Sequence, residues 1–237
     1  NTDKVDPREF EVAYDNLEEI DKWLISKYNK LVKCVTESMD NYDLTTSVRL
    51  IQNFVSEDLS NWYIRRNRRR FWASVNDTNK LGVYKVTYDI LVGVCKLVAP
   101  FAPFASEEIY TKLTNEKSVH LADYPTYDES LINEKIESRM DLVRDLISLG
   151  RNIREDVKIK VRQPISEALL DAKNESLISD LSDLIKEELN VKEVKFISDV
   201  ENYMNFTVKP NFKEVGKTFG PLMKDFQEKL LSLTSSD

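Results

Sequence analysis

Histidine, glycine and cysteine are scarce in this sequence of 237 residues, and each shortage excludes a class of site. The only histidine is His120, so a histidine-based metal cluster or proton relay cannot form. The five glycines form no phosphate-binding loop, because Gly216 and Gly220 lack the spacing of nucleotide-binding motifs. The two cysteines, Cys34 and Cys95, are far apart and outside any metal-like spacing, so we expect buried free thiols. The sequence therefore offers neither an active site nor a metal site.

Long apolar runs are also missing. The most apolar stretch, residues 90–105, is interrupted by Lys96, Pro100 and Pro103, and no run approaches the roughly 20 residues that a membrane helix needs. The sequence begins at Asn1 with neither a signal peptide nor a start methionine. We therefore expect a piece of a longer cytoplasmic protein that has no membrane partner.

Charged and hydrophobic residues are plentiful instead. They make up 32% and 41% of the chain, and with so few glycines and prolines this composition favours long helices over a sandwich or barrel. The formal net charge of -7 argues against a uniformly basic surface. A local basic patch can still attract phosphate, because screening limits charge attraction to about 10 Å.

Hydrophobic periodicity predicts a mainly α-helical fold. Asp43 is placed to cap a second helix, and Pro103 suits the first turn of a fourth. Four helices with short connections are typical of an antiparallel bundle. The predicted helices span residues 17–39, 44–72, 80–98 and 103–113. The first two each carry an apolar stripe, which consists of Leu17, Ile20, Leu24, Tyr28, Leu31 and Val35 on the first and of Val48, Ile51, Val55, Leu59 and Trp62 on the second.

The second half of the chain changes its pattern. A polar linker leads to a long helix at residues 131–156, and residues 158–162 then alternate basic and apolar side chains, as a strand with one wet face would. The buried positions expected on the long helix are Ile136, Met140, Val143, Ile147 and Ile153. Further strands are predicted at residues 165–170, 191–197 and 205–208, and further helices at 177–189 and 219–233. The sequence thus predicts three parts: a helical bundle at 1–124, a linker and long helix at 125–157, and a small α+β domain at 158–237.

A run of arginines between aromatic residues, from Asn61 to Trp72, is the strongest candidate for a binding segment. Guanidinium groups pair with phosphate through two hydrogen bonds, and aromatic rings stack on unpaired bases. Single-stranded RNA loops are recognised in this way. The same arginines also suit a structural network of ion pairs, and the sequence leaves both interpretations open.

Helical phase separates these arginines into two groups. At 100° per residue, Arg66 and Arg69 continue the apolar stripe of the second helix, so they are expected to turn inward toward carboxylates. Arg65, Arg68 and Arg70 are expected to project elsewhere, where a ligand can reach them.

A second basic group follows the long helix. It contains Arg151, Arg154, Lys158, Lys160 and Arg162. Charge alternation of this kind is usually only a solvated strand face, so by itself it indicates little about a ligand.

Several long motifs occur in a fixed order: IDKWLISK at 20–27, DLSNWYIRRNRRRFW at 58–72, LVAPFAPFASEEIY at 97–110 and SVHLADYP at 118–125. They resemble the anticodon-binding bundle of class I aminoacyl-tRNA synthetases for branched aliphatic amino acids. The arginine run ending in Phe71 and Trp72 is most similar to the isoleucine enzymes of the eukaryote-like type. KVRQPI at 160–165 and VKPNF at 208–212 also look like that type.

The resemblance implies a non-catalytic fragment that binds isoleucine tRNA at its anticodon stem-loop. The whole family enzyme uses ATP and Mg to join isoleucine to tRNA, in a domain marked by His-Ile-Gly-His-type and Lys-Met-Ser-Lys-Ser-type motifs that this sequence lacks. The editing domain has no counterpart, and two cysteines cannot build the zinc module of bacterial-type relatives. We therefore expect no cofactor in this fragment, tRNA but no DNA as a partner, and a monomer.

The resemblance and the basic segments together indicate contacts with tRNA at Arg65, Arg68, Arg70, Trp72, Arg154, Lys158, Lys160 and Arg162. One alternative is the same module of a valyl- or leucyl-tRNA synthetase. Another is a helical protein-interaction scaffold whose arginines form salt bridges, which predicts no salt-sensitive RNA binding.

Overall fold

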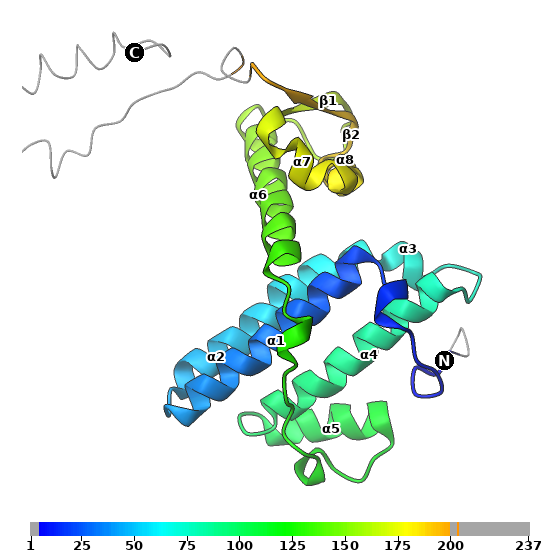
Figure 1. Ribbon diagram of the computed structural model, residues 1–237, viewed down its shortest axis with the longest axis vertical. Helices are drawn as coiled ribbons and strands as arrows, with labels where there is room; N and C mark the ends of the chain where they lie inside the picture. Colours follow the sequence, from blue (N-terminus) through cyan, green and yellow to red (C-terminus); the bar gives the residue numbers. More distant parts are fainter. Residues whose placement is uncertain (1–4, 200–202, 204–237) are drawn as a thin grey trace, which may run out of the picture. The chain divides into compact units, whose positions relative to one another are not determined.

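The computed structural model describes residues 5–199 and 203. The chain divides into two compact units, residues 1–141 and 142–237. The first unit is built of helices, and the second carries a small sheet (Figure 1). No helix among the described residues is both long enough and apolar enough to cross a membrane.

The first unit contains a bundle of helices, as the sequence predicted. Helix α1 packs against α2 and α4, and α4 packs against α5 (Figure 1). Asp43 caps α2 by accepting a hydrogen bond from the backbone N–H of Thr46 at 3.0 Å, and Pro103 is the first residue of α5, both as predicted. The bounds are α1 (Glu19–Asp40), α2 (Leu44–Asn53), α3 (Arg68–Phe71), α4 (Thr78–Val98) and α5 (Pro103–Thr114).

A π-helical segment, Phe54–Ile64, continues α2 and changes which side chains face the core. A π turn takes more residues than an α turn, so an apolar stripe extrapolated at α-helical spacing drifts off the buried face. The structure buries Phe54 and Leu59, whereas Val55 is half-buried. Val48 lies in α2 before the π-helical segment and is 40% exposed, so its predicted place on the apolar stripe was wrong.

The core of this unit lies where α1, the π-helical segment and α4 meet. It includes fully buried Trp23, Leu24, Tyr63, Val83 and Leu97. Both cysteines are free thiols, Cys95 buried and Cys34 only half-buried.

The polar linker after α5 is tied to α1. Asn29 accepts a hydrogen bond from the Asp128 N–H at 2.8 Å, and Ser26 accepts one from the Asn133 N–H at 2.8 Å. Ser26 in turn donates to the buried Glu137 carboxylate at 2.6 Å. These contacts fix the start of α6 (Glu134–Asp156), which begins in the first unit and ends in the second.

The second unit is a β-α-β arrangement. Strands β1 (Ile165–Asp171) and β2 (Val191–Ile197) are parallel, with Ile165 opposite Val191 and Asp171 opposite Ile197. Parallel neighbours need a crossover connection, which α7 (Glu175–Ile178) and α8 (Ser182–Leu189) supply. The core of this unit contains Val143, Ile147, Ile178, Ile185 and Leu189.

Part of the sequence-based prediction for this half is wrong. Residues 158–162 form a turn instead of a strand, and Lys158 adopts a left-handed backbone with φ of 57°. Ile153 was predicted to be buried but is 55% exposed, whereas Val143 and Ile147 are buried as predicted. The strand predicted at 205–208 and the helix predicted at 219–233 lie outside the described residues.

Candidate nucleic-acid interface

The arginine-rich segment is divided between two short helical pieces. The helix that includes the π turns runs on to Arg66, and Asn67 interrupts it with φ -86° and ψ 9°. Helix α3 then carries Arg68, Arg69 and Arg70 before the loop to α4. Side-chain directions extrapolated at 100° per residue fail across this break.

Arg70 turns into the protein, which corrects the prediction that it projects outward. Its Nη1 and Nη2 donate to the two oxygens of Asp21 at 2.8 and 2.7 Å, and Asp21 is fully buried. Nη1 also donates to Asn67 Oδ1, and Nη2 to the Asn79 carbonyl, each at 2.9 Å. Tyr63 Oη donates to Asp21 at 2.6 Å. We call Asp21, Tyr63 and Arg70 the buried cluster.

The buried cluster joins segments that are distant in sequence. The Glu18 N–H donates to Asp21 at 3.1 Å, so the cluster also caps the start of α1. Burial, together with the charge and hydrogen bond of Asp21, raises the pKa of Tyr63 well above its ordinary value. Burial by itself lowers the pKa of Arg70, but the hydrogen bonds and charge of Asp21 outweigh it and the pKa is raised. At neutral pH the cluster is therefore a neutral tyrosine and an ion pair.

Several residues of the same segment remain accessible. Trp72 is 79% exposed, an unusual state for so large an apolar ring. Arg68 is exposed, and Arg65 is half-buried with its Nε donating to the Asn61 carbonyl at 2.8 Å. Of the two arginines predicted to turn inward, Arg66 is half-buried and Arg69 is exposed. The structure thus offers a ring face and guanidinium groups beside a rigid anchor.

Arg154, in the second basic group, is also turned inward. It is 3% exposed, and its guanidinium donates to the carbonyls of Lys160, Gln163, Leu189 and Asn190 at 2.6 to 3.3 Å. These bonds fold the turn after α6 against the end of α8. The guanidinium nitrogens are used within the unit, so Arg154 is a positioning residue and its predicted contact with tRNA is not supported.

The turn after α6 exposes the basic residues that follow Arg154. Lys158, Lys160 and Arg162 are exposed. Arg151 pairs with the buried carboxylate of Glu188. Three of the predicted contacts in this group are therefore accessible to a polyanion.

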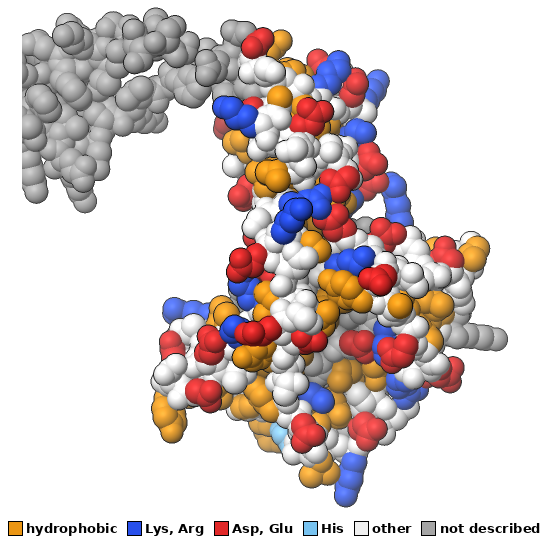
Figure 2. All heavy atoms as spheres, in the orientation of Figure 1, with side chains coloured by type: hydrophobic (Ala, Val, Ile, Leu, Met, Phe, Trp, Pro, Cys, Tyr) orange, Lys and Arg blue, Asp and Glu red, His pale blue; other side chains and the backbone are white. Residues whose placement is uncertain are grey.

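Charge on the visible surface is mixed. Figure 2 shows Lys and Arg side chains interspersed with Asp and Glu over both units, without a broad field of one sign. Phosphate attraction is thus expected to be local, at residues 61–72 and 151–162, which we call the two basic segments.

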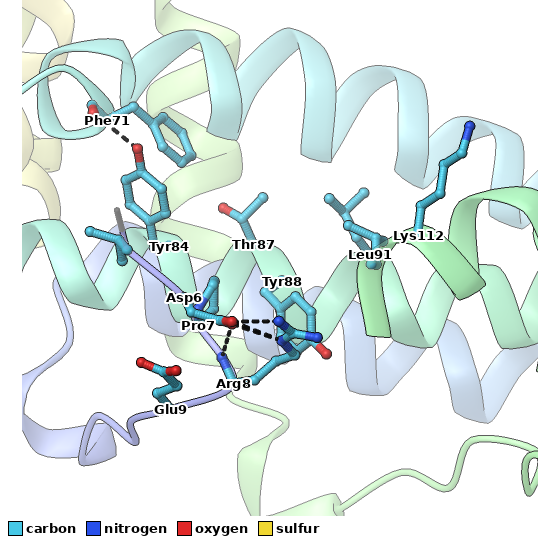
Figure 3. Close-up of a pocket in the computed structure, with 12 residues that line it drawn as sticks. Asp6, Pro7, Arg8, Glu9, Phe71, Tyr84, Thr87, Tyr88, Leu91 and Lys112 are labelled. Atoms are coloured by element: carbon cyan, nitrogen blue, oxygen red, sulfur yellow. Dashed lines mark hydrogen bonds and ion pairs between the residues drawn. The ribbon is translucent and has the colours of Figure 1, made fainter. Parts of the chain in front are cut away.

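A cavity of about 600 Å³ beside α4 is a weaker candidate for an anion site (Figure 3). Arg8 lines it, along with Tyr84 and Tyr88. Hydrogen bonds from Arg8 lower the pKa of Asp6 to about 2, and Arg8 also donates to the Thr114 carbonyl at 3.3 Å. The Arg8 guanidinium already donates hydrogen bonds to Asp6 and Thr114, which makes it a poorer donor for an anion in the cavity.

Metal-ligating side chains do not gather in the described part of the chain. No set of three or more His, Cys, Asp or Glu side chains within residues 5–199 and 203 is placed to hold a metal ion. His120 is exposed in the short turn Val119–Leu121. The two basic segments therefore remain the main candidates for a functional site.

Comparison with known proteins defines the class. Residues 21–169 match the family described as the anticodon-binding domain of tRNA ligases, and the chain belongs to that family. The particular relatives are isoleucine–tRNA ligases. The chain is 43% identical over 220 residues to the one from Clostridium novyi, an alignment covering 90% of this chain and 21% of the relative. It is 44% identical over 211 residues to that of Protochlamydia amoebophila, covering 86% and 20%.

The matches concern only part of each relative. A third isoleucine–tRNA ligase, from Cytophaga hutchinsonii, is 38% identical over 246 residues, covering 100% of this chain and 22% of the relative. The chain thus spans about a fifth of the length of these curated relatives. Its assignment to the eukaryote-like type stays a prediction.

Proposed function

We propose that this chain is the part of an isoleucine–tRNA ligase that holds isoleucine tRNA by its anticodon stem-loop. The observation that carries the proposal is the exposed Trp72 and Arg68 beside the buried cluster, in a chain of the anticodon-binding family. An anticodon loop presents unpaired bases next to phosphates, and the segment offers a partner for each.

The buried cluster fixes the conformation of the segment that carries Arg68 and Trp72 before tRNA binds. Ordering a loop upon binding costs free energy, so a segment fixed beforehand binds more tightly. Arg70 anchors α3 to α1 through Asp21, and α3 leads directly to Trp72. In this scheme Arg65 and Arg68 meet phosphate, Trp72 stacks on a base, and Arg70 is a positioning residue.

The exposed turn of the second unit supplies further phosphate contacts. Lys158, Lys160 and Arg162 lie on it, and Arg154 fixes its shape. Phosphate contacts position a nucleic acid without reading its sequence. Discrimination among anticodons is therefore assigned to the first unit.

The whole protein is proposed to be a monomeric cytoplasmic ligase that uses ATP and Mg to attach isoleucine to tRNA. This part contributes tRNA binding and no reacting group. The identity of the relatives supports isoleucine over valine or leucine.

The test is a titration of the chain with isoleucine tRNA transcript and with an anticodon-mutated transcript, at two salt concentrations. Trp72→Ala is expected to weaken binding to the cognate transcript by about 5- to 150-fold, since stacking on one base contributes about 1–3 kcal/mol. Phe104→Ala is the matched control, because Phe104 is an exposed ring of the same unit, 91% exposed, outside the arginine-rich segment.

The outcomes separate the alternatives. Tighter binding to a mutated transcript that carries a valine or leucine anticodon would assign the module to one of those enzymes. Absence of salt-sensitive binding to every transcript would favour a protein-interaction scaffold. Equal losses for Trp72→Ala and Phe104→Ala would reject the proposed surface.

A further inference from the structure

The cavity beside α4 has aromatic walls (Figure 3). Tyr84, Thr87, Tyr88 and Leu91 line it from α4, and their spacings of three, one and three residues place them on one face of that helix. Phe71 packs edge-on against the Tyr84 ring, with the ring centroids 5.5 Å apart and an interplanar angle of 65°. The volume of about 600 Å³ is typical of small-ligand sites, which span roughly 300–1,000 Å³. The cavity is therefore large enough for a planar ring system and offers rings on which it can stack.

Arg8 and Lys112 also line the cavity, and each is already paired with a carboxylate. Arg8 Nε and Nη2 donate to the two oxygens of Asp6 at 2.8 and 2.5 Å, and Lys112 pairs with Glu108 on the surface of α5. A guanidinium held by a carboxylate in this way keeps its planar faces available for stacking. The cavity therefore favours a planar uncharged ring over a free anion.

Tyr88 brings both a ring face and a polar group to the cavity. It is half-buried, and burial raises the pKa of its hydroxyl, an effect that the nearby charge of Arg8 partly offsets. The hydroxyl therefore stays protonated at neutral pH and can both donate and accept a hydrogen bond. An unpaired nucleobase has a π face that stacks on such a ring and polar edges that reach such a hydroxyl. A nucleobase thus uses both features of Tyr88, whereas an aliphatic ligand would use neither.

The cavity adjoins the proposed tRNA surface through Phe71. This residue lines the cavity and directly precedes Trp72, so the two Cα atoms are about 3.8 Å apart. Tyr84 Oη donates to the Phe71 carbonyl at 3.4 Å, which ties the end of α3 to the cavity wall. The lining residues and Trp72 all belong to the first unit. A loop of unpaired bases that places one base on Trp72 therefore has another base within reach of the cavity.

We propose that this cavity receives a second unpaired base of the anticodon loop, different from the base that stacks on Trp72. The base stacks on the ring of Tyr88, and the Tyr88 hydroxyl forms a hydrogen bond with its edge. The inference rests on the proposed function, because it requires tRNA to bind at the arginine-rich segment. It goes further in assigning a separate pocket on α4 and a residue, Tyr88, that contacts the base there.

A double-mutant cycle between protein and tRNA tests the proposal. The chain is titrated with isoleucine tRNA transcripts that each lack one base of the anticodon loop. Tyr88→Leu keeps an apolar side chain but removes the ring, and it is expected to weaken binding to the intact transcript by about 5- to 150-fold. Against one abasic transcript Tyr88→Leu should change affinity by less than about twofold, because the cavity is then empty in both proteins. That position should differ from the one that cancels the effect of Trp72→Ala.

Two further variants sharpen the test. Tyr127→Leu is the matched control, because Tyr127 lies outside the cavity and has Lys33 over its ring at 5.6 Å, much as Tyr88 has Lys85 at 6.0 Å. It should leave the affinity for every transcript unchanged. Tyr88→Phe keeps the ring and removes the hydroxyl, so it should lose only about 2- to 12-fold. 2-Aminopurine at the assigned position should lose fluorescence on binding to the unaltered chain and retain it with saturating Tyr88→Leu.

Several results would overturn the base pocket. If Tyr88→Leu leaves the affinity unchanged while Trp72→Ala weakens it, the pocket is rejected and the proposed function stands. If Tyr88→Leu weakens binding to every transcript by the same factor, the ring acts through the fold and contacts no base. If one abasic transcript cancels the effects of both variants, a single base accounts for both residues. Absence of salt-sensitive binding to every transcript would reject the proposed function and the pocket together.

Discussion

The two basic segments, one in each unit, follow a common plan with one instructive difference. Each turns one arginine inward, Arg70 in the first and Arg154 in the second, and exposes basic neighbours. Arg70 meets the buried carboxylate of Asp21, whereas the hydrogen bonds of Arg154 go to four main-chain carbonyls. The number of basic residues therefore does not identify the ligand contacts, because one arginine in each segment turns inward and hydrogen-bonds within its own unit.

The kind of acceptor, a carboxylate or main-chain carbonyls, determines how much stability is lost when each arginine is replaced. Without Arg70, the buried Asp21 carboxylate loses its ion-pair partner. An unpaired buried charge destabilises the fold more than an unpaired neutral carbonyl does. Without Arg154, carbonyl groups lose donors but water can reach them once the turn opens. The first unit should therefore depend more strongly on its buried arginine than the second.

The largest expected effect is for Arg70→Met, which keeps the length of the side chain and removes its charge. Unfolding of the first unit should cost about 3–5 kcal/mol less, as for other broken buried ion pairs. Urea titration followed by tryptophan fluorescence measures it, because Trp23 and Trp62 lie in that core. Arg68→Met is the matched control and should change stability by less than about 0.5 kcal/mol. Equal effects would remove the distinction between the inward and the outward arginine.

Arg154→Met should have the next largest effect, a loss on the order of 3 kcal/mol confined to the second unit. The three tryptophans all lie in the first unit, so hydrogen exchange in β1, α8 and β2 is the appropriate measurement. Exposed Arg162→Met serves as its control. A larger loss than for Arg70→Met would contradict the expected order of the two units.

A smaller effect is expected for Tyr63→Phe, which removes one hydrogen bond to Asp21 and should cost about 1–2 kcal/mol at neutral pH. Because the folded pKa of Tyr63 is raised, its contribution is complete below the unfolded value of about 10 and is lost as pH rises toward the folded value. The stability gap between the two proteins should therefore narrow above about pH 10, by up to roughly 1.4 kcal/mol per pH unit. A constant gap would place the hydroxyl outside the buried cluster.

The sequence predicted most of the fold because its signals were local. The stripe on α1, the Asp43 cap and Pro103 at the start of α5 depend on neighbouring residues, and the structure confirms them. The half-buried Val55 and the false strand at 158–162 have causes that periodicity does not contain. One is the π-helical segment, and the other is a left-handed residue, Lys158, in a turn closed by Arg154.

The candidate site was less predictable for the same reason. Basic and aromatic residues marked two segments that expose cations, but which arginine turns inward depends on Asp21, 49 positions away in sequence, and on the break at Asn67. The carbonyl acceptors of Arg154 at Leu189 and Asn190 are equally remote. A clue was present for Arg70: Asp21 lies among apolar residues in the first motif, and a buried carboxylate requires a partner.

The smallest effects are expected at the exposed cations, and they compare the two segments directly. Each phosphate contact removed should lower the slope of log affinity against log salt by about 0.7–0.9, with a modest loss of affinity. Arg68→Ala tests the first segment and Lys160→Ala the second, whereas Lys173→Ala, an exposed lysine outside both, is the control. A lower slope for both would extend the interface over the two units. A lower slope for Arg68→Ala alone would confine tRNA to the first unit, and the basic turn shaped by Arg154 would then be a solvated surface.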